Sequence, residues 1–240
     1  MIGIDPPFRI GGNPGAFFEP SDIHGFFERL AEARFEVKYP MSPGSMAVLP
    51  IVSTTTSVAP GIWRWSAFSP HHRVDLASHL VWDGWNCLVF DPLPLADPLW
   101  ATWPLEQKPG WLVLTNENHE RDVKAWSERF SDAVCMGLAG ERKENRLPSI
   151  PSNWVCFDLA GGAGGEAAFH CAALDLMVFG DAVVNLPGRG LELLPEKYCR
   201  NPAQLRHSLG LLPRFGRALL AHGEPLMERA SERIHAVVGS

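Results

Sequence analysis

Residues 111–122 read WLVLTNENHERD, an apolar run that passes directly into a polar cluster. The run from Trp111 to Leu114 has the length of a buried strand, and the cluster supplies one histidine, two asparagines, one arginine and three carboxylates. Val123, Trp126 and Phe130 then fall on one face at helical spacing. We therefore expect a strand, a loop that carries the polar groups, and a helix over about 123–130.

Three other apolar runs also end at a polar or titratable residue. Residues 87–90 precede Asp91, residues 177–180 precede Asp181, and residues 219–221 precede His222. Ligands bind at the carboxyl ends of strands in α/β sheets, so Asp181, His222 and the 116–122 cluster are expected to meet in one cleft. The alternative is that each polar residue ends its strand for local backbone reasons.

The remaining pattern indicates a mixed α/β protein in which strands outnumber helices. Strand-like runs cover 46–58, 74–82, 85–90, 111–114, 154–159, 174–179 and 218–221, and helical patterns cover about 202–212 and a segment beginning at Pro225. The region from Trp63 to Phe90 is expected to form antiparallel hairpins. We divide the chain into an N-terminal extension packed on the core (1–60) and one main domain (61–240).

The composition limits the classes of partner that we expect. A formal charge of -6 over 240 residues argues against a broad phosphate-binding surface, so we expect a small-molecule ligand or substrate and no nucleic acid. No secretory signal or membrane-spanning run is visible, which predicts a cytoplasmic protein without a membrane partner. The five widely spaced cysteines indicate free thiols. Homodimerisation through the extension or the Trp-rich hairpins is a further hypothesis.

The order of these motifs resembles the metallo-β-lactamase fold superfamily. The resemblance rests on the 111–122 stretch, the loop GGAGGE at 161–166, the sequence FGDA at 179–182 and the sequence AHGEP at 221–225, and it covers roughly residue 61 to the C-terminus. It implies a four-layer αββα sandwich. Members of this superfamily are mostly hydrolases that hold one or two metals in a cleft at one edge.

The ligand residues of that superfamily are largely replaced in this chain. Its first metal motif, HxHxDH, falls on Asn116, Asn118, Glu120 and Arg121, and its loop histidine falls on Gly162. Of the family's metal-binding positions, only Asp181 and His222 are kept. His119 lies outside the family positions, and the segment resembles a divergent branch with Asn-x-x-His-x-Arg here.

The replaced residues disfavour a conventional zinc centre. Catalytic zinc takes three protein ligands from imidazole, carboxylate or thiolate groups, and asparagine is a poor substitute. Arg121 carries a fixed positive charge, so we expect it to occupy the place of the metal and pair with Asp181 or Glu120. The expected cleft is completed by Glu166.

Two functions follow, and whether the chain is an enzyme is left open between them. The first is a hydrolase-like protein whose remaining activity, on a small ester, amide or thioester, depends on His119, Asp181 and His222 as catalytic and metal-binding residues. The second is a binding or interaction module that uses the same cleft without metal. We expect no cofactor, with a single Zn, Mn or Fe ion as the alternative.

Overall fold

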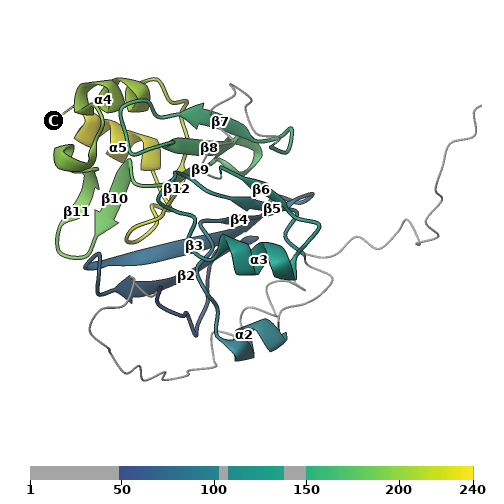
Figure 1. The fold of residues 1–240 in the computed structure, drawn as a ribbon. Helices are drawn as coiled ribbons and strands as arrows, with labels where there is room; N and C mark the ends of the chain where they lie inside the picture. The colour runs from purple at the N-terminus through teal and green to yellow at the C-terminus, as the bar shows by residue number, and fades with distance from the viewer. Residues whose placement is uncertain (1–48, 103–107, 138–149, 240) are drawn as a thin grey trace, which may run out of the picture.

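The computed structural model describes residues 49–102, 108–137 and 150–239, which form two stacked β-sheets with helices on both outer faces (Figure 1). The layers follow the order helix, sheet, sheet, helix, so the expected αββα sandwich is confirmed. Residues 1–48 lie outside the described part of the chain. The division at residue 60 therefore stays a prediction.

The first sheet contains six strands in the order of the chain. They are β1 (Thr56–Ala59), β2 (Ile62–Ser69), β3 (Val74–Trp82), β4 (Cys87–Phe90), β5 (Trp111–Val113) and β6 (Val134–Met136). Strands β2 to β4 pair antiparallel, as the sequence indicated, and β1 also pairs antiparallel with β2, whereas β4, β5 and β6 pair parallel. The parallel pairing brings the carboxyl ends of β4 and β5 to one edge, where Asp91 and Thr115 leave the sheet.

The second sheet has the order β12-β9-β8-β7, and a separate hairpin joins β10 to β11. The strands are β7 (Val155–Asp158), β8 (Ala167–Cys171), β9 (Leu176–Phe179), β10 (Val183–Leu186), β11 (Gly190–Leu193) and β12 (Arg217–Leu220). Because β12 and β9 are parallel, with Leu220 beside Phe179, the segments that carry His222 and Asp181 leave the sheet side by side.

The helices form the outer layers. They are α2 (Asp97–Thr102), α3 (Val123–Arg129), α4 (Pro202–Gly210) and α5 (Ala230–Val238), with short 3-10 turns at Ala172–Leu174 and Glu196–Tyr198. Residues of α2 and α3 pack with the first sheet, and residues of α4 and α5 pack with the second. The predicted helices at 123–130 and 202–212 are thus confirmed within one or two residues.

Three apolar cores separate the four layers, and they follow from the alternation of side chains along each strand. In β9, Leu176 and Val178 lie between the two sheets, while Met177 and Phe179 face the helical layer of α4 and α5. Strand β4 divides its residues in the same way between the central core and the α2/α3 core. Runs that are apolar at every position therefore belong to strands covered on both faces.

The last helix begins later than the sequence predicts. The pattern indicates a start at Pro225, but α5 begins at Ala230. Leu226 instead exchanges two backbone hydrogen bonds with Ala218, of 2.7 and 2.8 Å, and Arg229 adopts a left-handed φ of 50° just before the helix. Because the buried Leu226 packs in the same core as α5, its apolar position is consistent with either conformation.

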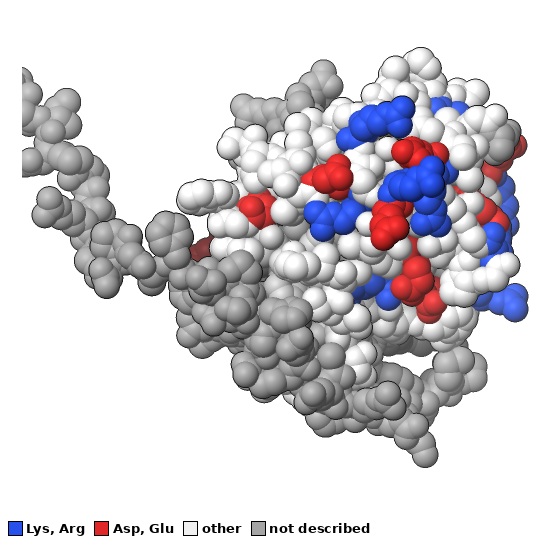
Figure 2. Space-filling model, turned by 180° about the vertical axis from the view of Figure 1, so that it is seen from behind, with Lys and Arg blue, Asp and Glu red and all other residues white. Residues whose placement is uncertain are grey.

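The predicted strand at 46–58 is also corrected, because within its described residues only Thr56–Val58 lie in a strand. The cysteine prediction holds, since all five thiols are free. Among the described helices, none is long and apolar enough to cross a membrane. On the face seen in Figure 2, basic and acidic side chains are interspersed, and neither forms a continuous patch.

Candidate metal centre

Strand ends from both sheets meet at one edge of the sandwich. The loop after β5 is tied to the second sheet by the hydrogen bond from the Ala167 N–H to the Thr115 carbonyl, 2.9 Å long. The segment after β12 is tied to the first sheet, where His222 forms an antiparallel bridge with Leu76. The loop that carries His119 and the segments that carry Asp181 and His222 are therefore brought together by backbone contacts between the sheets.

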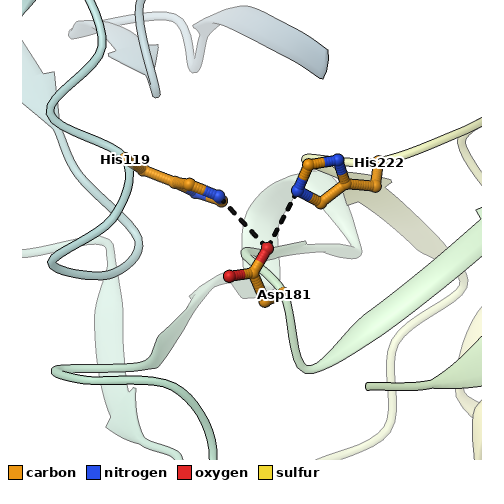
Figure 3. A group of neighbouring side chains, drawn as sticks. All are labelled: His119, Asp181 and His222. Atoms are coloured by element: carbon orange, nitrogen blue, oxygen red, sulfur yellow. Dashed lines mark ion pairs between the residues drawn. The ribbon is translucent and has the colours of Figure 1, made fainter. Parts of the chain in front are cut away.

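His119, Asp181 and His222 form the centre of this edge (Figure 3). The Nε2 atom of His119 lies 3.2 Å from Oδ1 of Asp181, and Nε2 of His222 lies 2.9 Å from the same oxygen. One potential ligand atom from each residue lies within 4.8 Å of the other two. The convergence that the sequence predicted for these three residues is thus present, while their catalytic roles stay a prediction.

The His119 ring is held from behind by Asp91. Its Nδ1 atom lies 3.0 Å from Oδ2 of Asp91 and 2.9 Å from the hydroxyl of Thr115. Asp91 in turn accepts hydrogen bonds from both the backbone N–H and the hydroxyl of Thr115. The buried carboxylate fixes the ring so that Nε2 faces Asp181.

The second histidine is oriented by the backbone. Nδ1 of His222 lies 3.1 Å from the carbonyl oxygen of Asp75, to which it donates when that nitrogen carries the proton. The next residue, Gly223, has a φ of 84°, and a Cβ there would overlap the carbonyl oxygen of Asn185. A glycine is therefore required for the chain to turn at this point and present Nε2 to Asp181.

The charged forms of His119, Asp91 and Asp181 stabilise one another. Burial alone would lower the pKa of His119, but Asp91 and Asp181 outweigh it and raise that pKa to about 9. Burial would raise the pKa of both carboxyl groups, yet His119 holds the pKa of Asp91 below its ordinary value and that of Asp181 well below it. Without metal at neutral pH, an imidazolium therefore lies between two carboxylates.

Asn116 and Glu166 form a second polar layer beneath Asp181. The Asn116 amide donates to Oε2 of Glu166 at 2.9 Å and to Oδ2 of Asp181 at 3.1 Å, and the Ala182 N–H donates to Oε1 of Glu166. Burial, followed by the negative charge of Asp181, raises the pKa of Glu166 to about 8. Glu166 therefore takes up a proton at a higher pH than an exposed glutamate does.

Two glycines make room for the Glu166 side chain. A Cβ at Gly162 would lie 2.8 Å from the Glu166 Cγ, and one at Gly180 would lie 2.8 Å from its Oε1. The resemblance drawn from the sequence predicts that the loop histidine of the superfamily falls on Gly162. In this chain the space beside Gly162 is filled by the side chain of Glu166.

The expected ion pair of Arg121 is not formed. Its Nη1 donates to the carbonyl oxygens of Ala77, at 2.5 Å, and of Asp91, at 3.0 Å, and no carboxylate of the described residues lies within salt-bridge distance. A left-handed φ of 42° at Arg121 turns the side chain toward the first sheet. Arg121 therefore braces β3 against the loop after β4 and does not take the place of a metal.

Two of the other predicted cleft residues, Asn118 and Glu120, are exposed, and no hydrogen bond or ion pair of the described residues joins their side chains to the triad. Asp91, in contrast, was identified only as the end of a strand. The useful signal was its position directly after an apolar run, the same signal that identified Asp181.

The triad fits a single divalent metal ion. Two imidazoles and one carboxylate are a common ligand set for catalytic zinc and for other first-row metals. Metal-binding histidines usually donate the N–H of the ring nitrogen that does not bind the metal to an acceptor. Both Nδ1 atoms face such acceptors here, so both Nε2 atoms are available on the side of Asp181. Asn116 is directed at Asp181 as a hydrogen-bond donor and belongs to the supporting layer.

Neither a protein-family model nor a curated protein matches this chain. Solved structures do match its fold. The DIM-1 metallo-β-lactamase exposed to ceftazidime aligns with a TM-score of 0.58 and 13% identity over 80% of this chain and 98% of that one. The mono-zinc form of FIM-1 from Pseudomonas aeruginosa aligns with a TM-score of 0.55 and 15% identity, over 79% and 96% of the two chains.

A metallo-β-lactamase from Erythrobacter litoralis gives the same result. It aligns with a TM-score of 0.54 and 14% identity over 80% of this chain and 94% of that chain. At such low identity the likeness concerns the fold, and the coverage shows that nearly the whole length of these structures has a counterpart in the present chain.

Proposed function

We propose that this chain, which has the metallo-β-lactamase fold, is a hydrolase that uses one divalent metal ion to cleave a small ester, amide or thioester. The observation that carries the proposal is the orientation of two histidines toward one carboxylate oxygen, with both Nδ1 atoms facing acceptors. When bound, the metal supplies an activated water and polarises the carbonyl group of the substrate. The overall reaction adds water across the acyl bond and releases an acid and an alcohol, amine or thiol.

The residues of the chain have separate roles in this proposal. His119, Asp181 and His222 bind the ion, and Asp91 keeps the His119 proton on Nδ1 so that Nε2 is free to coordinate. Asn116 orients Asp181 by donating to its second oxygen. The similar FIM-1 structure is a mono-zinc form, so a structure with this fold holds a single zinc ion, which supports the proposal of one ion here.

One observation favours the competing function, a binding module without metal. The negative charge of Asp181 is already met by the His119 imidazolium, by His222 and by the Asn116 amide. A site that is complete with protein groups alone would bind a small polar ligand and lack hydrolytic activity. The two functions therefore differ in whether a metal displaces the proton of His119.

Metal analysis distinguishes the metal-dependent hydrolase from the binding module without metal. The purified full chain is analysed after exchange against Zn, Mn and Fe. The hydrolase proposal predicts about one ion per chain for the wild type and large losses for His222→Ala and Asp181→Asn. His207→Ala, on the exposed side of α4, is the matched control and should bind metal like the wild type. Metal contents below about 0.1 per chain for all three metals would exclude the metal-dependent function.

A direct assay completes the test. The metal-loaded wild type should hydrolyse simple activated esters or thioesters, and the rate should fall by at least about a hundredfold in the metal-binding variants. A protein that binds metal fully but hydrolyses none of these acyl classes would contradict the catalytic part of the proposal.

A further inference from the structure

Two strands of the first sheet place a histidine and an arginine together between the sheets. His79 on β3 and Arg64 on β2 are direct partners in the antiparallel register, so their side chains leave the same face of the sheet. The residues two positions away, Ile62 on β2 and Val81 on β3, lie in the core between the two sheets. Arg64 and His79 therefore point into the interior of the sandwich and not toward the helices.

Both side chains carry a buried nitrogen atom that no described residue satisfies. His79 is 1% exposed, and its Nε2 atom has no hydrogen-bond partner among the described residues. Nε of Arg64 is also buried and unpaired within that part of the chain, although its Nη2 donates to the Gly223 carbonyl. Because Nε lies nearer the main chain than Nη2, the unpaired N–H is on the side of the guanidinium that is closer to β3. Unpaired buried donors cost free energy, so this pair indicates a ligand.

A third unpaired nitrogen belongs to the same part of β3. Nη1 of Arg121 donates to the carbonyl of Ala77, which lies two residues before His79 on that strand. The buried Nη2 of Arg121 has no partner among the residues that the structure describes. Two guanidinium groups and one imidazole thus have unused nitrogens around one short stretch of β3.

The charges around these nitrogens favour an anion. Burial, followed by the charge of Arg64, lowers the pKa of His79 to about 3, so the ring is neutral and, with its proton on Nε2, donates one hydrogen bond. Asp91 is the carboxylate that opposes this effect, but its oxygens already face Thr115 and His119. A water molecule that accepted all three donors would have no acceptor for its own protons, whereas an anion needs none.

We infer that the interior of the sandwich holds one chloride ion, bound by the unpaired nitrogens of Arg64, His79 and Arg121. His79 lies three residues, or about 10 Å, along β3 from the bridge between Leu76 and His222. The ion therefore lies inside the fold, away from the triad, and its binding does not depend on the proposed hydrolysis. Its role is to satisfy buried donors from two strands and a loop and so to stabilise their packing.

The stability of the full chain in different salts tests this site. Thermal unfolding is measured in sodium chloride and in sodium gluconate at the same ionic strength of about 0.1 M, with a chelator present so that chloride does not act through a bound metal. The midpoint should be at least about 3 °C higher in chloride, because the ion binds only the folded state and gluconate is too large for the interior. Bromide should act like chloride. Equal midpoints in chloride and gluconate would overturn the inference.

Two variants assign the effect to this site. His79→Leu and Arg64→Gln should each reduce the chloride-dependent shift to less than about 1 °C. In gluconate His79→Leu should be at least as stable as the wild type, because it removes an unpaired buried nitrogen. Arg206→Gln is the matched control, since that guanidinium also donates to backbone carbonyls, those of Val237 and Val238, and it should keep the full shift. If Arg64→Gln does not fold, His79→Leu decides, and a full shift in His79→Leu would reject the site.

The position of the ion is measured separately in crystals of the wild type grown from bromide. Anomalous scattering should show one bromide at hydrogen-bonding distance from Nε2 of His79 and Nε of Arg64. Crystals of His79→Leu should lack this peak and keep any peaks at the protein surface. Bromide confined to the surface, or a water molecule between the two side chains, would contradict the inference.

Discussion

Asp91 orients the ring of His119 and raises the pKa of that histidine. Replacing it with asparagine keeps the size of the side chain but removes the charge that faces Nδ1 of the histidine. We expect Asp91→Asn to lower the metal affinity by about 10–100-fold, the usual effect of losing such a supporting carboxylate. The measurement is a competitive zinc titration, with the exposed Asp132→Asn as control.

The same variant should lower the pKa of His119, because the nearer of its two carboxylate partners is neutralised. NMR titration of the metal-free protein measures this shift. A purely structural role for Asp91 would reduce stability and leave the pKa of His119 unchanged.

The protonation of His119 and Glu166 makes the metal-free protein sensitive to alkaline pH. The folded protein holds the His119 proton up to a pKa of about 9, against 6.5 for an ordinary histidine. The contribution of protonated His119 to the stability of the folded protein is therefore fully present below pH 6.5 and is lost as the pH rises through 9. Glu166, whose pKa rises from 4.5 to about 8, acts in the same direction at lower pH.

Thermal unfolding of the metal-free protein should therefore begin at a lower temperature at pH 9 than at pH 6.5. The contribution of His119 is about 3 kcal/mol at most, or roughly 5–10 °C. His119→Gln should flatten this dependence, whereas His207→Ala should retain it. A wild-type midpoint that increases between these pH values would contradict the assignment.

Residue by residue, the sequence was sufficient for positions that follow regular strands. Asp181 and His222 were identified because each follows an apolar run, and His119 because it lies in the polar cluster after β5. Arg121 was placed with the wrong partners because the direction of its side chain depends on a left-handed φ, which no apolar pattern reports. Asp91 also follows an apolar run, but the sequence does not show that its carboxylate faces His119.

At the scale of elements, the turn after β12 is the most sensitive connection. Gly223 and Gly188 both have positive φ values, 84° and 75°, but a Cβ at Gly188 meets nothing within 4 Å. Gly188→Ala should therefore cost only the backbone strain, about 1–2 kcal/mol. Gly223→Ala adds a clash with the backbone of Asn185, and we expect a loss of about 3 kcal/mol or more.

Urea denaturation of the two alanine variants measures the difference. Gly223→Ala should also reduce metal binding, since His222 precedes the distorted turn, while Gly188→Ala should bind metal normally. Equal losses of stability in both variants would show that the contact with Asn185 is relieved at little cost.

Element boundaries were predicted where periodicity and turn residues agree. Strand β3 matches the predicted run from residue 74 to 82, and α3 follows the spacing of Val123 and Trp126. Strand β8 was missed because its sequence, AAFHC, has small residues and no alternation. The start of α5 was misplaced because burial of Leu226 fits a helix and an extended segment equally well.

At the scale of the whole molecule, the candidate metal centre takes its residues from both sheets. His119 follows a strand of the first sheet, whereas Asp181 and His222 follow strands of the second. An ion bound by these three residues would therefore stabilise the packing of the sheets against each other. Zinc at about a hundred times its dissociation constant should stabilise the folded protein by roughly 2.7 kcal/mol.

Differential scanning calorimetry with and without a chelator tests this stabilisation. The midpoint of the wild type should fall when zinc is removed, and that of His222→Ala should not respond. Identical midpoints for the wild type in both conditions would show that no ion links the sheets.

The origin of the triad in two sheets also has a consequence for the order of folding. His119 and His222 are separated by about two fifths of the chain, and we expect them to approach only after both sheets have formed and docked. Contacts between such distant segments form late, because closing a long loop costs conformational entropy before the contacts can stabilise the chain. Uptake of zinc during refolding would therefore mark the final docking step, and a nascent chain would bring these three residues together only when nearly all of it has been synthesised.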